Sequence, residues 1–191
     1  VFMGMGEPLD NHVELFRAIE VLTAPWGMAW SPKRITVSTV GKLDRLSDLV
    51  EKTKVHVAVS LHNPFSEQRL EMMPVERAFP IAKVIELLRH HDWSRQRRLS
   101  IEYTMWEGVN DSPRHAAALA RMLAPLPGVR VNIIRFHRIP GSDLRPCTKE
   151  RMEEFRDRLN SRGITATIRA SRGEDIMAAC GMLAGAEKKN D

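Results

Sequence analysis

Several polar side chains in this sequence stand where short apolar runs end. The first run gives way to Gly4, Gly6 and Glu7, so a carboxylate follows residues that let a ligand approach the backbone closely. Later runs end on Ser38 with Thr39, Ser60 with His62 and Asn63, Glu102 with Tyr103, and His137. Carboxylates, hydroxyls and imidazoles gathered at one place can bind a polar ligand and exchange protons with it. Singly, a serine there is more often a turn former and His137 a solvated loop residue, but the set indicates a binding site.

A second candidate centre is the cysteine near the carboxyl terminus. Cys180 stands between Ala179 and Gly181, which leave its thiol open to a bulky partner. The alternative is that Cys180 is a small buried apolar residue, the commoner state of a free cysteine. Cys147 lies in a loop before a helical pattern, and we interpret it as incidental. The sequence holds no C-x-x-C, no H-E-x-x-H and no carboxylate-rich loop, so we expect any metal to be held by residues upstream of Val1.

The elements that must position these residues alternate between strands and helices. β-branched runs predict strands at 1–5, 34–39, 56–61, 99–105, 130–136 and 164–169. Helical periodicity predicts helices at 13–22, 43–52, 67–73, 81–90, 114–123 and 149–161, and a last one from 174 to about 184. This alternation predicts an α/β fold with βαβ units around a parallel sheet. Several strands are apolar nearly throughout, which predicts that both faces of the sheet are covered.

Two observations favour part of a (βα) barrel over an open dinucleotide-binding sheet. Ligand-type residues follow several strands in succession, as they do at the mouth of a barrel. No G-x-G-x-x-G follows any predicted strand. Because the chain begins with Val1 inside a predicted strand, we expect it to be the carboxyl-terminal portion of a larger protein, with all of 1–191 in a single barrel domain and its extension.

Composition sets broad limits on the class of protein. Of 191 residues, 43% are hydrophobic and 28% charged, as in ordinary globular domains. No apolar run approaches a membrane span, no signal peptide is evident, and two cysteines make no disulfide framework, so a cytoplasmic setting is expected. The net charge of +5 is compatible with a polyanionic partner but does not by itself indicate one.

Two features that could contact nucleic acid have simpler interpretations. The run Arg95-Gln-Arg97-Arg98 falls between a predicted helix and a predicted strand, where a solvated connector is favoured over an RNA contact. We interpret the tryptophans as packing or rim residues rather than as platforms for stacked bases; they are Trp26, Trp30, Trp93 and Trp106.

Several strings of residues occur along the chain in one order. They are Met-Gly-Met-Gly-Glu-Pro-Leu at 3–9, Arg-Ile-Thr-Val-Ser-Thr at 34–39, Val-Ala-Val-Ser-Leu-His at 57–62, Met-Pro at 73–74, Gly-Val-Asn-Asp-Ser at 108–112 and Ser-Arg-Gly-Glu-Asp-Ile-Met-Ala-Ala-Cys-Gly at 171–181. In sequence, order and spacing they resemble the motifs of the RlmN/Cfr family of radical S-adenosylmethionine (SAM) RNA (adenine) methyltransferases. The resemblance covers essentially the whole chain, and independent motifs at matched spacing are more specific than any one of them.

The resemblance implies a partial radical SAM barrel whose N-terminal strand and cluster-binding loop are missing from this chain. Gly6 and Glu7 match the pair that holds the methionyl amino group of SAM. Other cofactor-binding positions of the family are matched by Ser38, Ser60, Leu61 and His62, and His137 stands where the family has a cofactor-contacting Asn. Cys180 matches the catalytic cysteine that accepts a methyl group and carries it to RNA.

The reaction implied by the resemblance is methylation of adenine at C2 in 23S rRNA, with tRNA as a further substrate. In the family, one SAM methylates the cysteine matched by Cys180. A second SAM, cleaved at a [4Fe-4S] cluster with an electron from a donor such as flavodoxin, provides a radical that activates this methyl group. The resolving cysteine then forms a disulfide with Cys180. The cluster ligands, the resolving cysteine and the general base are all expected before Val1, so this fragment alone is expected to be inactive.

One stretch departs from the family pattern and leaves alternatives open. The chain reads Ile134-Arg-Phe-His-Arg138 where the family has Ile-Pro-Trp/Tyr-Asn-Pro. An imidazole at His137 can still donate one hydrogen bond in place of the Asn. The alternatives are a paralogue that methylates adenine C8 or another RNA target, a non-catalytic RNA-binding barrel, and a metabolic barrel enzyme.

Overall fold

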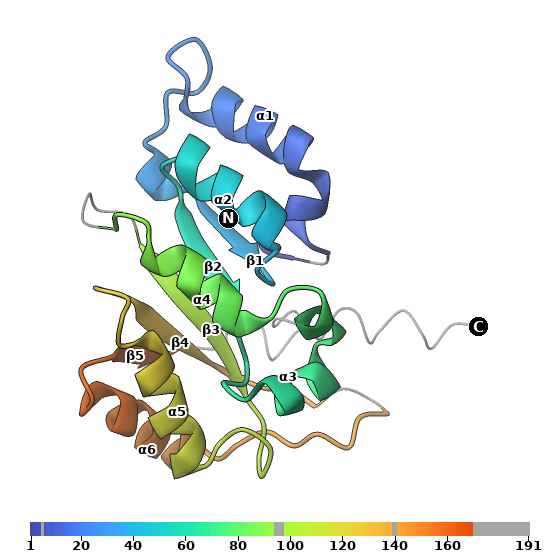
Figure 1. Ribbon diagram of the computed structural model, residues 1–191, viewed down its shortest axis with the longest axis vertical. Helices are drawn as coiled ribbons and strands as arrows, with labels where there is room; N and C mark the ends of the chain where they lie inside the picture. Colours follow the sequence, from blue (N-terminus) through green and yellow to red (C-terminus); the bar gives the residue numbers. More distant parts are fainter. Residues whose placement is uncertain (5, 94–97, 139–140, 170–191) are drawn as a thin grey trace.

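The computed structural model describes residues 1–4, 6–93, 98–138 and 141–169, and its chain path is shown in Figure 1. Five strands form one sheet in the order β1-β2-β3-β4-β5, and all four neighbouring pairs are parallel. The strands are β1 (Thr36–Thr39), β2 (His56–Ser60), β3 (Leu99–Met105), β4 (Arg130–Arg135) and β5 (Thr165–Ile168). Strands adjacent in the sequence are adjacent in the sheet, as in one stretch of a barrel wall. The predicted α/β fold with a parallel sheet is confirmed.

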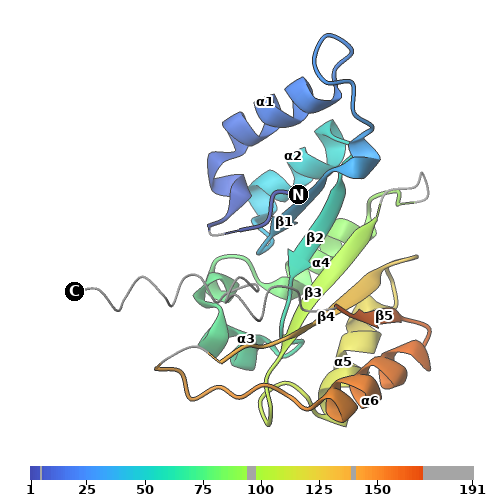
Figure 2. The same ribbon diagram turned by 180° about the vertical axis from the view of Figure 1, so that it is seen from behind.

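Helices connect successive strands and cover one side of the sheet. The α-helices are α1 (His12–Thr23), α2 (Leu43–Lys52), α3 (Ser66–Met72), α4 (Ile81–Arg89), α5 (Pro113–Leu123) and α6 (Lys149–Asn160). Three 3-10 helices precede or follow them: η1 (Pro8–Asn11), η2 (Pro32–Arg34) and η3 (Pro74–Arg77). The opposite views in Figures 1 and 2 show α2, α4, α5 and α6 packed on the same face of the sheet. None of the described helices is long and apolar enough to cross a membrane.

Element boundaries agree best with the sequence where capping signals are strong. α5 begins at Pro113 because Ser112 accepts a hydrogen bond of 3.4 Å from the backbone N–H of His115. Gly163 follows α6 with φ +79°, a left-handed conformation that glycine adopts without strain. The predicted strand at 1–5 is wrong as a strand of that length: Phe2 alone bridges to Val37. The predicted helix after 174 lies outside the described residues.

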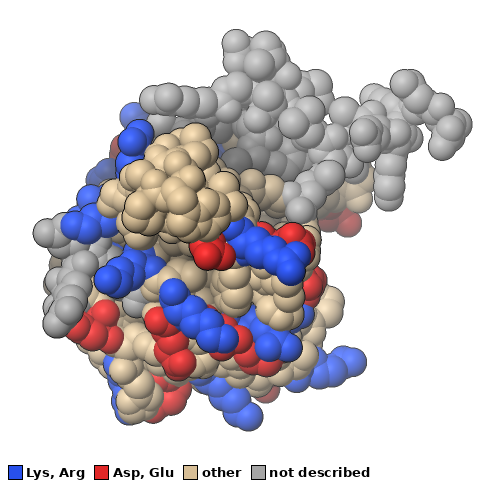
Figure 3. Space-filling model, turned by 90° about the horizontal axis from the view of Figure 1, so that it is seen from above, with Lys and Arg blue, Asp and Glu red and all other residues tan. Residues whose placement is uncertain are grey.

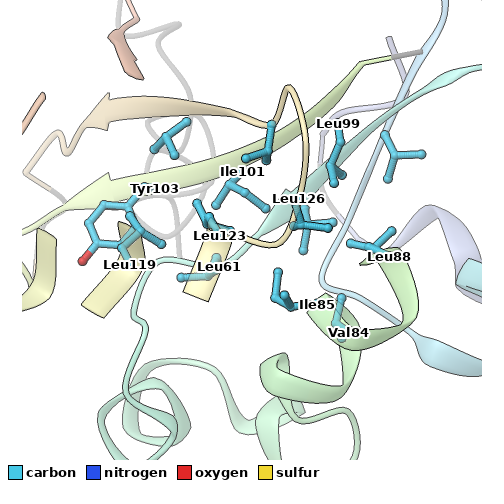
Figure 4. Packing of buried hydrophobic residues seen from close by; sticks show 14 of the residues in the cluster. Leu61, Val84, Ile85, Leu88, Leu99, Ile101, Tyr103, Leu119, Leu123 and Leu126 are labelled. Atoms are coloured by element: carbon cyan, nitrogen blue, oxygen red, sulfur yellow. The ribbon is translucent and has the colours of Figure 1, made fainter. Parts of the chain in front are cut away.

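The two faces of the sheet differ in chemistry because successive side chains of a strand point to opposite sides. The face under the helices carries the apolar core, part of which is shown in Figure 4 around Ile101, Tyr103, Leu119 and Leu123. On the other face, one row of paired residues is polar: Ser60, Glu102, Asn132 and Thr167. The prediction that several strands are covered on both faces holds for the centre of β2, whereas burial alternates in β4 and β5. A polar inner face is what a ligand-binding barrel requires.

Candidate functional site

The amino-terminal segment lies against the edge strand β1. The N–H of Phe2 donates to the carbonyl of Thr36 at 2.8 Å, and the N–H of Ser38 donates to the carbonyl of Phe2 at 3.0 Å. This pairing brings the following Gly6 and Glu7 to the carboxyl end of β1. Gly6 has φ +89° with no atom within 4 Å of where a Cβ would stand, so the backbone there is both left-handed and open.

The carboxylate of Glu7 joins this segment to β1. Its Oε1 accepts the N–H of Leu9 at 3.0 Å, which caps η1, and its Oε2 accepts the N–H of Val40 at 2.8 Å. Each carboxylate oxygen has a second acceptor position, so both atoms can still bind a donor from a ligand. Glu7 is therefore held in place by the backbone while it stays able to receive an ammonium group.

A hollow of about 470 Å³ opens beside this segment. Gly4, Gly6 and Glu7 line one side of it, and Glu14 and Ala18 of α1 line the other. Ser38, Ser60 and His62 do not line it. The predicted site residues beyond Gly6 and Glu7 are instead placed by the sheet: Ser38 and Ser60 lie on its polar face on adjacent strands, one row apart.

A buried ion pair that the sequence analysis missed holds the turn after β2. Arg69 of α3 is fully buried and pairs with Glu76, whose Oε2 also accepts the N–H of Ile81 at 2.9 Å. The guanidinium group donates to three carbonyl oxygens: those of Leu61 at 3.0 Å, Ser60 at 3.1 Å and Val40 at 3.3 Å.

The Arg69–Glu76 pair thus fixes the ends of β1 and β2 relative to each other. Burial lowers the pKa of Arg69, and the hydrogen bond to Glu76 opposes this effect. Leu61 is part of the core, with its side chain fully buried, and both its N–H and its carbonyl are hydrogen-bonded within the protein. Its predicted contact with a cofactor stays a prediction.

His62 follows β2 in a left-handed conformation with φ +59°, which is rare for a side chain of this size. Its Nδ1 accepts the N–H of Thr104 at 3.0 Å, so the neutral ring carries its proton on Nε2. Burial, reinforced by the positive charge of Arg69, lowers the pKa of His62 to about 4. At neutral pH the ring is an uncharged hydrogen-bond donor through Nε2.

Asn110 ties the His62 turn to the end of β3. Its Nδ2 donates to the carbonyls of His62 at 2.6 Å and Thr104 at 2.7 Å, and its Oδ1 accepts the N–H of Trp106 at 2.8 Å. The side chain is fully buried and satisfied by these contacts. The N-cap of α5 is Ser112, so the side chain of Asn110 is available for this connection.

Glu102 lies on the polar face of the sheet. Its Oε1 accepts hydrogen bonds from Ser100 at 3.0 Å and from Asn132 at 2.7 Å. Its buried Oε2 has no hydrogen-bond partner among the described residues and lies 3.6 Å from a guanidinium nitrogen of Arg169.

Three residues expected with the site have structural roles instead. Tyr103 points to the opposite face from Glu102, stacks on Phe155 with ring centroids 5.2 Å apart, and donates to the carbonyl of Asn110 at 2.7 Å. Thr39 and Asn63 are buried and accept backbone N–H groups of their own turns. Their expected place at the rim is wrong, and for Tyr103 the reason is strand alternation.

An aromatic group follows the ends of three neighbouring strands. The ring of Trp106 lies 5.9 Å from the imidazole of His62 and 5.9 Å from the ring of Phe136, measured between centroids. The indole N–H of Trp106 is buried without a hydrogen-bond partner among the described residues. His137 comes directly after Phe136 and is partly buried. The sequence therefore placed His137 at the correct end of β4.

Of the two cysteines, the structure describes only Cys147. Cys147 is buried, and burial together with the nearby carboxylates of Asp111 and Glu107 raises the pKa of its thiol to about 12. A buried thiol with this pKa stays protonated at neutral pH and is a poor nucleophile. Cys180 lies outside the described residues. Within the described part of the chain, no three His, Cys, Asp or Glu side chains gather as a metal site would require.

Comparisons with known proteins agree with the motifs. A protein named "Probable dual-specificity RNA methyltransferase RlmN" from Parabacteroides distasonis is 56% identical over 187 residues, which are 98% of this chain and 54% of that protein. A protein of the same name from Roseiflexus sp. is 41% identical over 199 residues, covering 100% of this chain and 50% of its own length. No family model matches the chain.

Solved structures show the same pattern. The crystal structure of a radical SAM methyltransferase from Sphaerobacter thermophilus matches with a TM-score of 0.88 and 40% identity, covering 94% of this chain and 53% of that one. A domain of a pyruvate-formate lyase-activating enzyme from Bacteroides vulgatus, with a TM-score of 0.65 and 20% identity, shares the fold alone. The chain spans about half the length of the curated relatives it matches.

Proposed function

We propose that this chain, a confirmed homologue of the RlmN proteins, forms the SAM-binding and methyl-carrying part of a radical SAM RNA methyltransferase. The main support is the set of hydrogen bonds that link Glu7 to Val40, and Val40 through Arg69 to Ser60. Together with the bonds of Ser38 to Phe2 and of His62 to Thr104 and Asn110, this network holds a carboxylate, two serines and an imidazole at or near the carboxyl ends of adjacent parallel strands. Barrel enzymes bind their substrates at this end.

The donors and acceptors of this site suit SAM. The second acceptor positions on Glu7 can take the hydrogens of an ammonium group, while Ser38 and Ser60 offer hydroxyls on the polar face. The Nε2–H of His62 adds one donor. Because the imidazole is uncharged, it does not repel the sulfonium cation of the ligand. Gly6 leaves the backbone open to the ligand, and we assign a further contact to His137.

The [4Fe-4S] cluster does not fit the described residues, because such a cluster is held by several cysteine thiolates and Cys147 is the one cysteine among them. We therefore assign the cluster ligands to a part of the protein outside this chain, and expect the chain alone to be inactive. When bound, the cluster and SAM would supply a carbon radical, with the electron coming from a donor such as flavodoxin.

Cys180 is the proposed methyl carrier, an assignment supported by its motif. The proposed acceptor is C2 of adenine in 23S rRNA, with tRNA as a second substrate in the cytoplasm. This carbon is electron-poor and is not methylated directly by a sulfonium ion. A methyl group carried on the sulfur of Cys180 and activated by hydrogen abstraction can add to it.

The test is the nucleoside produced by a fusion of this chain to the half of the Parabacteroides distasonis relative that it does not match. RNA lacking adenine C2 methylation is treated with the fusion, digested, and analysed by mass spectrometry. We expect 2-methyladenosine from the parent fusion and none from Cys180→Ala, while Glu51→Gln on the exposed side of α2 serves as a control. A product of 8-methyladenosine would overturn the C2 assignment, and an unchanged yield from Cys180→Ala would overturn the methyl-carrier role.

A further inference from the structure

The turn between α1 and η2 exposes three large apolar side chains. Trp26 is 70% exposed, Met28 54% and Trp30 39%. Trp93 is buried, as expected of a packing residue, whereas Trp26 lies on the surface. Large apolar side chains exposed together to water often mark a site where another molecule binds, so the turn is a candidate contact surface.

Backbone contacts hold this turn in one shape. The N–H of Met28 donates to the carbonyl of Val21 at 2.9 Å, and the N–H of Trp30 donates to that of Leu22 at 2.8 Å. A Cβ at Gly27 would lie 2.0 Å from the carbonyl oxygen of Val21, so only glycine fits there. Ala29 has φ +51°, a conformation that costs free energy for a residue with a side chain. The aromatic side chains are therefore presented by a fixed backbone.

Basic side chains surround the turn. The guanidinium group of Arg34 lies over the ring of Trp30, 5.7 Å from its centroid. Exposed cations follow the amino-terminal edge of the sheet, just before or at the start of successive strands; they are Lys33, Arg34, Lys52, Lys54, Arg98 and Arg130. Lys52 pairs with Asp48 at 2.8 Å, so part of this charge is already compensated. Figure 3 looks onto this end of the molecule and shows uncharged surface protruding beside blue basic side chains, with red acidic side chains among them.

A groove of about 420 Å³ runs at the foot of the turn. Its lining includes the apolar Phe16 and Ile19 of α1, the cations Lys52 and Lys54, and the carboxylate of Glu20. Aromatic rings next to cations suit a single-stranded nucleic acid, because its bases can stack on the rings while its phosphates lie against the cations.

We propose that this surface, composed of the 24–30 turn, the groove and the flanking cations, binds an unpaired segment of RNA. Bases stack on Trp26 and Trp30, and phosphates lie against Arg34, Lys52 and Lys54. The surface is at the opposite end of the strands from Glu7 and His62, about 20 Å away along β3. This inference rests on the proposed function in one respect, namely that RNA is the substrate, and it adds a contact remote from the methylated base.

The test uses the full chain and a fluorescein-labelled oligoribonucleotide without secondary structure, with binding followed by anisotropy over a series of salt concentrations. Trp26→Ala and Trp30→Ala should each weaken binding about tenfold. Lys52→Ala with Lys54→Ala should lower the salt slope by roughly 1–2. The matched controls are Val13→Ala and Arg158→Ala, two exposed residues away from the turn, and both should bind like the parent.

A second measurement separates stacking from indirect effects. RNA should quench the tryptophan emission of the parent chain, and Trp26→Phe should remove much of the quenched signal while it preserves the fold. The proposal would be overturned if the Trp26→Ala and Trp30→Ala variants bound RNA as tightly as the controls, or if the parent did not bind RNA at low salt. The proposal would also be overturned if the tryptophan emission of the fusion protein did not respond to RNA, because the 24–30 turn would then be covered by the other half of the protein. Failure of the proposed function can be told apart from failure of this proposal. In that case RNA binding still depends on Trp26 and Trp30, but no methylated nucleoside is formed.

Discussion

The backbone N–H of Thr104 donates a hydrogen bond of 3.0 Å to Nδ1 of His62. The bond spans two neighbouring strands, and it decides which nitrogen of the imidazole carries the proton. Protonation of Nδ1 would break the bond and place a cation near the buried guanidinium group of Arg69. His62 is thus maintained as a neutral donor, which is the state that the proposed SAM site requires.

This arrangement predicts a pH dependence of stability. The pKa of His62 is about 4 in the folded chain and 6.5 in the unfolded one, so the unfolded state binds more protons between these values. The contribution to stability is present above pH 6.5 and is lost as the pH falls toward 4, by roughly 2–3 kcal/mol.

Urea denaturation between pH 7 and pH 4 measures the effect. His62→Asn tolerates the left-handed backbone and removes the titration, so its stability should fall less steeply than that of the parent. Burial also lowers the pKa of His115, which leaves a residual slope in the variant. An identical slope in both proteins would contradict the assignment.

Loss of the Arg69–Glu76 pair should destabilise the fold strongly. Arg69→Met leaves Glu76 buried without its partner and frees the carbonyls of Ser60 and Leu61, at a cost of roughly 3–5 kcal/mol in the free energy of unfolding. The matched control is Arg17→Met, which removes an exposed ion pair with Glu14 and should cost less than about 1 kcal/mol. Similar losses in the two variants would mean that the buried pair does not organise the site.

Asn110 should stabilise the fold because its side chain holds the backbone of the turn at His62 to the end of β3. Asn110→Asp keeps the size of the side chain but replaces the amide donor with an acceptor that faces the carbonyl oxygens of His62 and Thr104. We expect a loss of roughly 2–4 kcal/mol, measured by thermal or urea unfolding. Asn160→Asp, an exposed change at the end of α6 that keeps the oxygen bonded to the N–H of Ala166, is the comparison and should be much milder. A mild effect at position 110 would show that the turn holds without its amide.

Cys147 should be chemically inert in the folded chain. Its thiol has a pKa of about 12 and is buried, so alkylation by iodoacetamide at pH 8 should be slow until urea is added. Peptide mass spectrometry distinguishes this site from Cys180. Rapid native labelling of Cys147 would contradict both its burial and its raised pKa.

The sequence predicted the elements well where local signals agree. The bounds of α2 and β3 match the prediction, and the start of α5 and the end of α6 coincide with local signals, the Ser112-Pro113 cap and Gly163. These features depend on neighbours in the chain, and they can be recognised in a single sequence.

Other features depend on contacts between distant residues and left no local signal. Arg69 occurs in a polar helix, where a charged residue normally faces solvent. Its burial is explained by the ion pair with Glu76 and by carbonyls at the ends of two strands. Tyr103 is different, because strand alternation already places it on the opposite face from Glu102. Applied to that pair, the rule would have removed Tyr103 from the predicted rim.

The most direct test of the central claim is the affinity of the cluster-loaded fusion for SAM, measured by equilibrium dialysis for the parent, Glu7→Gln and the Glu51→Gln control. Glutamine at position 7 lacks the charge for an ammonium group and loses one backbone acceptor, so unfolding is measured in parallel. With the fold intact, the dissociation constant for Glu7→Gln should rise roughly 10- to 100-fold, and that of the control should not change. Equal affinity of a folded Glu7→Gln protein and its parent would contradict the claim that this rim holds the cofactor.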